Sequence, residues 1–388
     1  MGIQATQRNY EFYRNSELHY SIGVIPWNLH VRFCTRQKNT INHCYFSENK
    51  MKLRPLLILL SFFFILPLSA FAEKQAAGTI TMEFDLSSSA GTGEETRLWI
   101  PYPLSDENQQ ISNISVSGDY VESGVYSDRK YSTPMLYARW DKESKSRKLT
   151  FSFHVVRREV IKKDFPVKEA AWDPADYAMF LEPTKSGPID GMVKDLADAI
   201  TAGKTTVGEK ARAIYDWICV NMYRDPKTKG CGTGDVCSLL ASRKGKCTDI
   251  HSVFVALARA AGIPSREIFG VRLGKKAVVN VSTWQHCWAE FFLPGYGWVP
   301  VDPADVLKLM LKKNLKPEDA ETAELREYFW GGWDPYRVEL SRGRDLELNP
   351  PQQGAPLNTF GYPYAETGNR PHDWLEPEKF SYTITFRE

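Results

Sequence analysis

The chain has 388 residues, and its 49 Lys and Arg residues against 47 Asp and Glu residues give a formal net charge of +2. Hydrophobic residues make up 43% and charged residues 25%, which excludes a disordered, collagen-like or coiled-coil chain. The near-neutral charge argues against a dedicated nucleic-acid-binding protein, which normally carries a basic excess. The length favours two domains, and seven cysteines are too few for a disulfide scaffold.

The N-terminal region carries the three parts of a secretory signal peptide, predicted over residues 51–72. Lys52 and Arg54 precede an apolar run, and the small residues of Ala70-Phe71-Ala72 mark a cleavage site. The alternative is an uncleaved anchor, because the apolar stretch reaches the lower limit of a membrane-spanning length. Residues 1–50 lie upstream of the signal's own methionine, so we interpret them as an upstream extension or a tail outside the fold.

Removal of this leader changes the charge of the chain. Residues 1–72 hold eight basic and three acidic side chains, so the remainder has a net charge of −3 and five cysteines. No second long apolar run follows. The sequence therefore predicts an exported protein, periplasmic or extracellular, with no stable membrane span after cleavage and no nucleic-acid partner. Its oligomeric state is left open.

Residues 73–164 have the pattern of a β-sandwich. Short segments alternate polar and apolar residues and are separated by turns rich in Ser, Gly and Asp. These predicted strands cover residues 79–86, 97–100, 111–116, 135–140 and 148–156. No cluster of catalytic residue types occurs among them.

Residues 165–189, rich in Pro, Asp and aromatic residues, are predicted to be an ordered linker. After it the hydrophobic period becomes helical, first over residues 192–200. Thr206 and Glu209 then fit a capping box at the start of a second helix. We assign residues 190–388 to a second domain with a C-terminal extension.

A third helix is predicted to begin at Cys247, within the stretch Gly245–Asp249. Apolar residues recur at helical spacing as far as Ala261, and Gly262 followed by Pro264 ends the helix. A cysteine at a helix N-terminus is favoured as a thiolate, because the helix dipole and the free N–H groups stabilise negative charge.

A β-hairpin follows, with its turn at residues 294–297. If Phe292 pairs with Trp298, Asp302 lies diagonal to His286 on the same face of the sheet, within reach of a hydrogen bond. A register slipped by one residue would turn Asp302 to the other face.

Cys247, His286 and Asp302 together have the chemistry of a catalytic triad. A thiolate can attack an acyl carbon, a histidine can carry the proton to the leaving group, and an aspartate can fix the histidine tautomer. The sequence predicts these three roles in that order.

Two segments resemble a known family. These are GKCTDIHSVFVALARAAGIPSREIFG and QHCWAEFFLPGYGWVPVDPAD. They are similar to the transglutaminase-like superfamily of bacterial exported proteins, whose pattern is G-x-C-x-D at a helix start, then H-x-W-x-E, then G-W-x-x-x-D. The resemblance is strongest over residues 196–305 and extends more weakly to the β-domain. It implies an α+β fold with a papain-like core, in which the helix that carries the cysteine packs on an antiparallel sheet.

The same resemblance assigns the nucleophile to Cys247, the base to His286 and the orienting carboxylate to Asp302. It does not fix the reaction, because members of the family include protein cross-linkers, peptidases, amidases and inactive relatives. We therefore keep the alternative reactions open.

Several neighbouring residues have a structural and a functional interpretation. His251 is a second candidate base, and Asp249 is expected to be a helix-charge residue rather than a catalyst. Trp284 and Trp288 are expected to pack in the core, with a wall of the substrate groove as the alternative. The amide of the nucleophile is the natural oxyanion donor, and Tyr223 is a candidate for the second one.

The other cysteines suggest no metal centre. Cys231 and Cys237 can form a disulfide or remain free, and their spacing matches no zinc pattern. Cys219 and Cys287 are expected in the core. No cofactor is predicted.

Beyond the hairpin, residues 307–313 are interpreted as a surface helix rather than a membrane-binding one. The tail from residue 329 ends in a predicted strand at 380–386. We expect this tail to pack on the catalytic core or to close over the cleft.

The favoured function is an exported thiol-dependent enzyme that hydrolyses protein or peptide amide bonds, as a cysteine peptidase or amidase. The first alternative is a protein-glutamine γ-glutamyltransferase that cross-links proteins. The second alternative is a non-catalytic envelope binding module. The predicted partner is a protein or peptide substrate.

Overall fold

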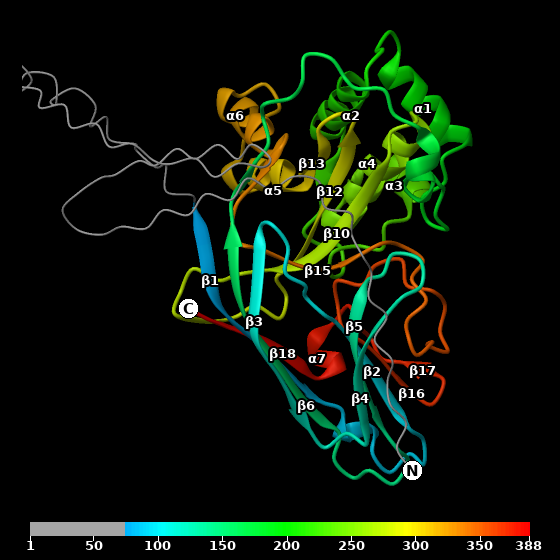
Figure 1. Ribbon diagram of the computed structural model, residues 1–388, viewed down its shortest axis with the longest axis vertical. Coiled ribbons are helices and arrows are strands. Elements are labelled where there is room, and N and C mark those ends of the chain that lie inside the picture. The colour runs from blue at the N-terminus through cyan, green and yellow to red at the C-terminus, as the bar shows by residue number, and fades with distance from the viewer. Residues whose placement is uncertain (1–73) are drawn as a thin grey trace, which may run out of the picture. The chain divides into compact units, whose positions relative to one another are not determined.

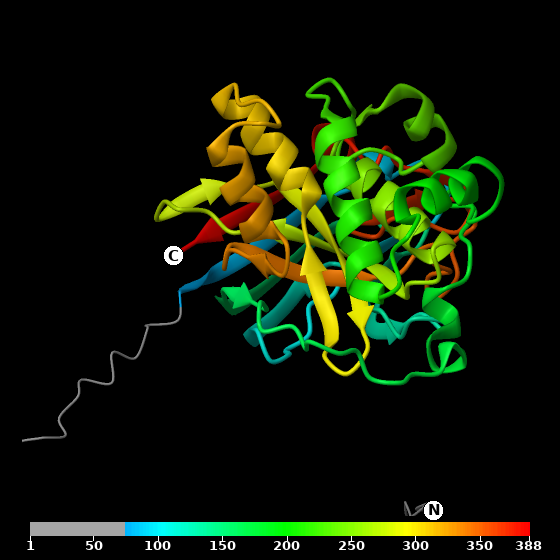
Figure 2. The same ribbon diagram turned by 90° about the horizontal axis from the view of Figure 1, so that it is seen from above.

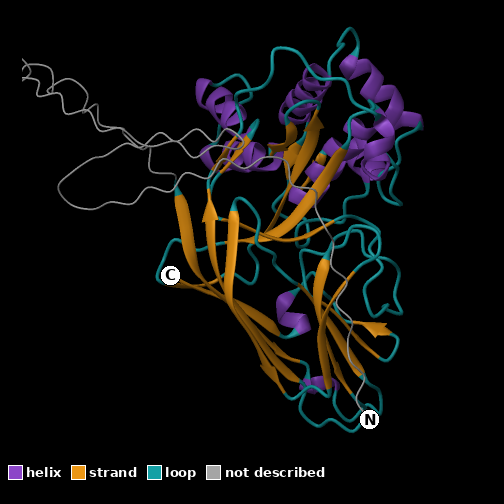
Figure 3. Cartoon of the chain, viewed as in Figure 1, coloured by secondary structure: helices purple, strands orange, loops and turns teal. Residues whose placement is uncertain are grey.

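The computed structural model describes residues 74–388 (Figures 1 and 3). The predicted extension (1–50) and signal peptide (51–72) lie outside the described residues. Among the described residues, no helix combines the length and hydropathy that a membrane span requires. The fold is α+β, with antiparallel sheets and helices, as the sequence predicted.

Two five-stranded antiparallel sheets form the predicted β-sandwich. The first has the order β11 (Val278–Asn280), β18 (Tyr382–Arg387), β1 (Gln75–Asp85), β6 (Lys148–Arg158), β3 (Gln109–Gly118). The second has the order β17 (Arg370–Pro371), β16 (Tyr364–Thr367), β2 (Thr96–Pro101), β5 (Pro134–Trp140), β4 (Glu122–Ser127). Alternate side chains of both sheets, among them Ile80, Phe151 and Leu98, share one apolar core. Strand β4 was not predicted, because its side chains are mostly exposed or half-buried.

The C-terminal tail follows the expectation only in part. Its segment Arg337–Arg342 pairs with Ser265–Arg272 of the predicted catalytic domain, as expected. Its last strand, β18, instead pairs with β1 in the sandwich, with Tyr382 opposite Phe84. The physical reason is that Tyr382, Ile384 and Phe386 alternate on one face and complete the apolar core of the sandwich. The strands β11, β16 and β17 join the same two sheets, so the sandwich is not confined to residues 73–164.

A third antiparallel sheet carries the predicted hairpin. Its order is β13 (Gly297–Val301), β12 (Gln285–Leu293), β10 (Ser265–Arg272), β15 (Arg337–Arg342). The helices on one side of it are α1 (Gly191–Thr201), α2 (Val207–Asn221), α3 (Val236–Ser242) and α4 (Cys247–Ala260). Figure 2 shows these green helices on the opposite side of the yellow hairpin from α5 and α6. The predicted capping box at the start of α2 is present, with the Glu209 amide donating to Thr206 Oγ1 at 3.2 Å.

Helix α4 is buried on every side, not along one stripe as its apolar spacing predicted. The strands β10 and β12 cover one face, while α1, α2 and α3 cover the others. A helix that is surrounded by other elements in this way is expected to be apolar around most of its circumference. The packing of the whole helix therefore holds its first residue, Cys247, in place.

The remaining elements are short or lie beside this core. They are α5 (Pro303–Lys313), α6 (Ala320–Phe329), α7 (Pro377–Phe380), the 3-10 turns η1 (Ser87–Ser89) and η2 (Pro174–Phe180), the pair β7 (Val160–Ile161) and β14 (Gly332–Trp333), and the parallel pair β8 (Tyr223–Arg224) and β9 (Lys244–Gly245). The predicted linker contains η2, whose Tyr177 ring stacks on Phe292 with ring centroids 4.0 Å apart.

Candidate active site

The G-x-C-x-D motif builds the start of α4. The Asp249 carboxylate accepts hydrogen bonds from the Lys246 amide at 3.0 Å and from the Gly234 amide at 2.9 Å, so it ties a glycine-rich loop to the first turn. A Cβ at Gly245 would lie 2.4 Å from the Asp249 Cβ, which explains why glycine occupies that position. Asp249 is buried, and this burial raises the pKa of its carboxyl group. Its contacts support the structural interpretation.

His286 and Asp302 meet as the hairpin register predicts. Phe292 pairs with Trp298, and the His286 Nε2 atom lies 2.7 Å from Asp302 Oδ2. The other oxygen, Oδ1, accepts from the Asp305 amide at 2.8 Å and caps helix α5. Because one oxygen is fixed by the cap, the other is held in place against the imidazole.

Cys247 lies at the first position of α4, and it lines the same cleft as His286. The pKa of its thiol is held well below the usual range, chiefly by its interactions with the neighbouring Cys231 and Cys287 thiols. Burial opposes this shift, and the charge of His286 adds to it. Since His286 uses Nε2 toward Asp302, its Nδ1 atom is the ring nitrogen left for another partner.

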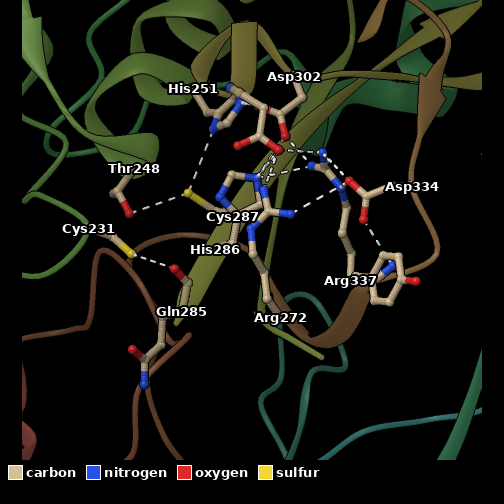
Figure 4. Close-up of polar contacts among 12 residues, drawn as sticks. Cys231, Thr248, His251, Arg272, Gln285, His286, Cys287, Asp302, Asp334 and Arg337 are labelled. Carbon is tan, nitrogen blue, oxygen red and sulfur yellow. Dashed lines mark hydrogen bonds and ion pairs between the residues drawn. The ribbon is translucent and has the colours of Figure 1, made fainter. Parts of the chain in front are cut away.

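Arg337 is a residue of the site that the sequence analysis missed. It comes from β15, it is buried, and its guanidinium group pairs with Asp302 and lies 2.7 Å from Asp305 Oδ2 and 3.1 Å from Asp334 Oδ2 (Figure 4). Burial would raise the pKa of the Asp302 carboxyl group, but Arg337, followed by His286, holds it well below the usual range. No local pattern marks Arg337, because it reaches the site from a distant strand.

His251 is a second histidine that contacts Asp302. Its Nε2 atom lies 3.2 Å from Asp302 Oδ1, and its Nδ1 atom lies 3.7 Å from the Cys287 sulfur (Figure 4). Burial would lower the pKa of His251, but the Asp302 carboxylate raises it. His251 therefore lies behind the aspartate, which fits a supporting role better than that of the base.

Two further thiols lie beside Cys247. The Cys231 thiol donates to the Gln285 carbonyl oxygen at 3.3 Å, and Cys287 lies on the face of β12 that α4 covers. The pKa of the Cys231 thiol is raised by its interaction with Cys247 and by burial. The pKa of the Cys287 thiol is raised by burial first and then by its interaction with Cys247. Cys231 and Cys237 are both free, so the possible disulfide between them is absent from the described residues. The sequence placed Cys287 in the core but did not indicate its proximity to Cys247.

One group of side chains has the spacing of metal ligands, namely His286, Asp302 and Asp305. Arg337 already places its positive charge between the two carboxylates. A cation there would be repelled by the guanidinium group, so these residues fit an ion-pair network better than a metal site.

The two tryptophans of the hairpin differ. Trp284 is 38% exposed and lines a cleft, whereas Trp288 is fully buried and packs against Trp333. Glu290, the last residue of H-x-W-x-E, accepts a hydrogen bond from Arg266 at 2.7 Å. Only Trp284 therefore fits the interpretation as a wall of the groove.

Tyr223 does not fit the role of the second oxyanion donor. Its side chain is 59% exposed, it does not line the cleft, and its amide donates to the Arg243 carbonyl oxygen. The amide of Cys247, at the first position of α4, has no intrahelical acceptor and remains available as a donor.

The cleft that contains Cys247 and His286 has a volume of about 610 Å³. Its wall is formed by the start of α4, the beginning of β12, the segment after β10, and helix α5. Cys247 itself is only 2% exposed, so its sulfur lies at the base of the cleft.

Comparison with known proteins agrees with this geometry. Residues 194–303, which include the three candidate residues, match the family described as the transglutaminase-like superfamily. An uncharacterized protein of Haemophilus influenzae is 39% identical over 328 residues, which cover 78% of this chain and 89% of that protein. The chain belongs to the transglutaminase-like superfamily.

Two solved structures are similar at lower identity. A proposed cysteine protease from Cytophaga hutchinsonii is 17% identical, with a TM-score of 0.48, and the match covers 81% of this chain and 99% of that one. The periplasmic domain of TgpA from Pseudomonas aeruginosa is 16% identical, with a TM-score of 0.34, and the match covers 61% of this chain and 91% of that domain.

Proposed function

We propose that this chain is an exported thiol-dependent enzyme that hydrolyses protein or peptide amide bonds through Cys247, His286 and Asp302. The observation that carries the proposal is that Cys247, at the first position of α4, lines the same cleft as His286, whose Nε2 atom lies 2.7 Å from Asp302 Oδ2. Export rests on the leader at residues 51–72.

The proposed reaction has two steps. The Cys247 thiolate attacks the amide carbonyl carbon, the Cys247 amide stabilises the oxyanion, and His286 gives its proton to the leaving amine as the C–N bond breaks. Water then attacks the thioester, with His286 taking its proton, and releases the carboxylic acid and the thiolate. Asp302 keeps the imidazole in one orientation during both steps.

The charge of the cleft supports hydrolysis over cross-linking. A cross-linking enzyme must admit the cationic side chain of a lysine as its acceptor. Basic side chains such as Lys246, Lys308 and Lys312 line this cleft, and their positive charge disfavours the entry of a protonated lysine acceptor. Water has no such barrier.

The test is turnover of a library of peptides by the mature chain, compared with Cys247→Ala and with the matched variant Cys237→Ala. Cys237 is exposed on α3 and does not line the cleft. We expect Cys247→Ala to abolish cleavage and Cys237→Ala to leave it unchanged.

Added primary amine separates the two reactions. A carboxylic acid product in the presence of amine supports hydrolysis, whereas an amide formed with the amine would establish the transferase instead. Equal cleavage by the two cysteine variants would contradict Cys247 as the nucleophile, and no cleavage by any of the three chains would favour the binding module.

A further inference from the structure

The cleft around Cys247 is strongly basic, although residues 73–388 carry a net charge of −3. Seven of its lining residues are Lys or Arg, and Asp334 is the single acidic one. Asp334 is already paired, with Arg337 at 3.1 Å and with Arg272 at 3.6 Å. The positive charge of the cleft is therefore not neutralised by its own wall.

Six of these basic side chains form no ion pair with any residue in the 74–388 range. They are Arg224, Lys246, Lys275, Lys276, Lys308 and Lys312. Unpaired cations are normal on an open surface, but here they come from four separate segments of the chain and converge on one concavity. Such an arrangement concentrates a positive potential in the place where a substrate binds.

Helix α5 contributes two of these charges. Lys308 and Lys312 are four residues apart and share one face of the helix, which destabilises the helix slightly through like-charge repulsion. Lys308 is half-buried, and its pKa is lowered by this burial and by the nearby charges of Arg272 and Arg224. An anion in the cleft would relieve both the repulsion and the desolvation.

We propose that the substrate is an acidic peptide, whose carboxylates occupy the basic wall while its scissile amide lies against Cys247. This inference rests on the proposed function, because it places the ligand by the residue that would attack it. A peptide is favoured over a small inorganic anion because Trp284 and Tyr336 add aromatic wall to the same cleft of about 610 Å³.

The binding test uses Cys247→Ala, which keeps the basic wall and prevents turnover. The probes are a fluorescent peptide with glutamates on both sides of its central residues and the same peptide with glutamines, measured by anisotropy. We expect the acidic peptide to bind about tenfold more tightly at low salt, and the difference to shrink at high salt because the charges are screened.

Two double variants in the same background locate the effect. Lys308→Gln with Lys312→Gln should weaken binding of the acidic peptide about tenfold and leave the glutamine peptide unchanged. Lys313→Gln with Lys316→Gln removes the same charge from exposed positions that do not line the cleft, and should leave both affinities unchanged. Equal affinity for the two peptides, tighter binding of an oligonucleotide of the same charge, or equal losses in the two double variants would overturn the proposal.

Turnover by the chain with Cys247 intact separates this proposal from the proposed function. Equal cleavage of the acidic and the neutral peptide would overturn the substrate class and leave the enzyme standing. Selective binding of the acidic peptide without cleavage would support the class and contradict the enzyme.

Discussion

At Cys247, neighbouring groups favour the thiolate even though the side chain is buried. Interactions with the Cys231 and Cys287 thiols and the charge of His286 lower the pKa of the Cys247 thiol, against the effect of burial. The flanking thiols have raised pKa values, so the negative charge is expected on one sulfur of the three.

The first prediction concerns alkylation by iodoacetamide. Because the pKa of Cys247 is well below 9.0, its alkylation rate should fall much less between pH 8 and pH 6 than that of an ordinary thiol. A small free thiol of pKa about 8.5 slows by roughly 70-fold over the same range. The site is identified by peptide mapping, and a rate at Cys247 that falls as steeply as the free thiol would refute the thiolate.

The second prediction concerns Arg337, which neutralises Asp302 and Asp305 in a buried network. Arg337→Met should reduce the free energy of unfolding by about 3–5 kcal/mol, because it leaves buried carboxylates without a counter-charge. The control Arg326→Met breaks a partly exposed pair with Asp216 and should cost about 1 kcal/mol or less. Similar losses in urea unfolding for both variants would contradict this account.

The pH dependence of the same network has a definite sign. The pKa of Asp302 is lower in the folded state than its ordinary value of 3.8, so its stabilisation is present above that value and is lost as the pH falls further. The parent chain should therefore keep this contribution at pH 5 and lose it below about pH 4. In Arg337→Met this part of the pH dependence should weaken.

At the scale of elements, the sequence predicts helices and strands correctly where the signals for them are local. The cysteine helix has a glycine start, a helical period and a Gly–Pro stop, and the hairpin has a tight turn that fixes Phe292 against Trp298. These two elements bring together His286 and Asp302, and they place Cys247 at the first position of α4.

The parts that sequence reasoning missed depend on long-range pairing. Arg337 lies in β15, far along the chain from His286, and its guanidinium group reaches the site only because β15 pairs with β10. The strand β18 returns to β1 across almost the whole described chain. A single sequence carries the propensity of such strands but not the identity of their partners.

The third prediction concerns the loop that Asp249 ties to α4. Gly245→Ala should destabilise the fold by about 1–3 kcal/mol, because the new Cβ would lie 2.4 Å from the Asp249 Cβ. Gly208→Ala is the matched control in helix α2, where the nearest atoms would be 3.5 Å away. Thermal unfolding compares the two variants, and a Gly245→Ala chain as stable as the control would argue against this packing.

At the scale of the whole described molecule, the four-stranded sheet that carries the hairpin also contributes side chains to the apolar core of the sandwich. Val271 of β10 and Val338 of β15 belong to the same cluster as Phe151 and Phe386 of the sandwich. The strand β11 lies between β10 and β12 in the sequence, but it pairs with β18 in the sandwich. We therefore expect the described residues to unfold as one cooperative unit.

The fourth prediction tests this cooperativity. Phe386→Ala removes a buried ring from β18 and should cost about 3–5 kcal/mol, whereas Thr383→Ala, exposed on the same strand, should be nearly neutral. Tryptophan fluorescence and the labelling of buried Cys219 in α2 should report the same shifted urea midpoint. A shift in only one of the two signals would show that the two parts unfold separately.

The central claim is that Cys247 forms a covalent acyl intermediate, and intact-protein mass spectrometry after a rapid acid quench tests it most directly. Mixed with a glutamate-flanked peptide ester, the mature chain should gain the mass of the acyl group on Cys247 within the first turnover, and the Cys247→Ala chain should gain none. The adduct should disappear as the carboxylic acid product accumulates. Product formation without any adduct on Cys247, or an equal adduct on the Cys247→Ala chain, would contradict the account.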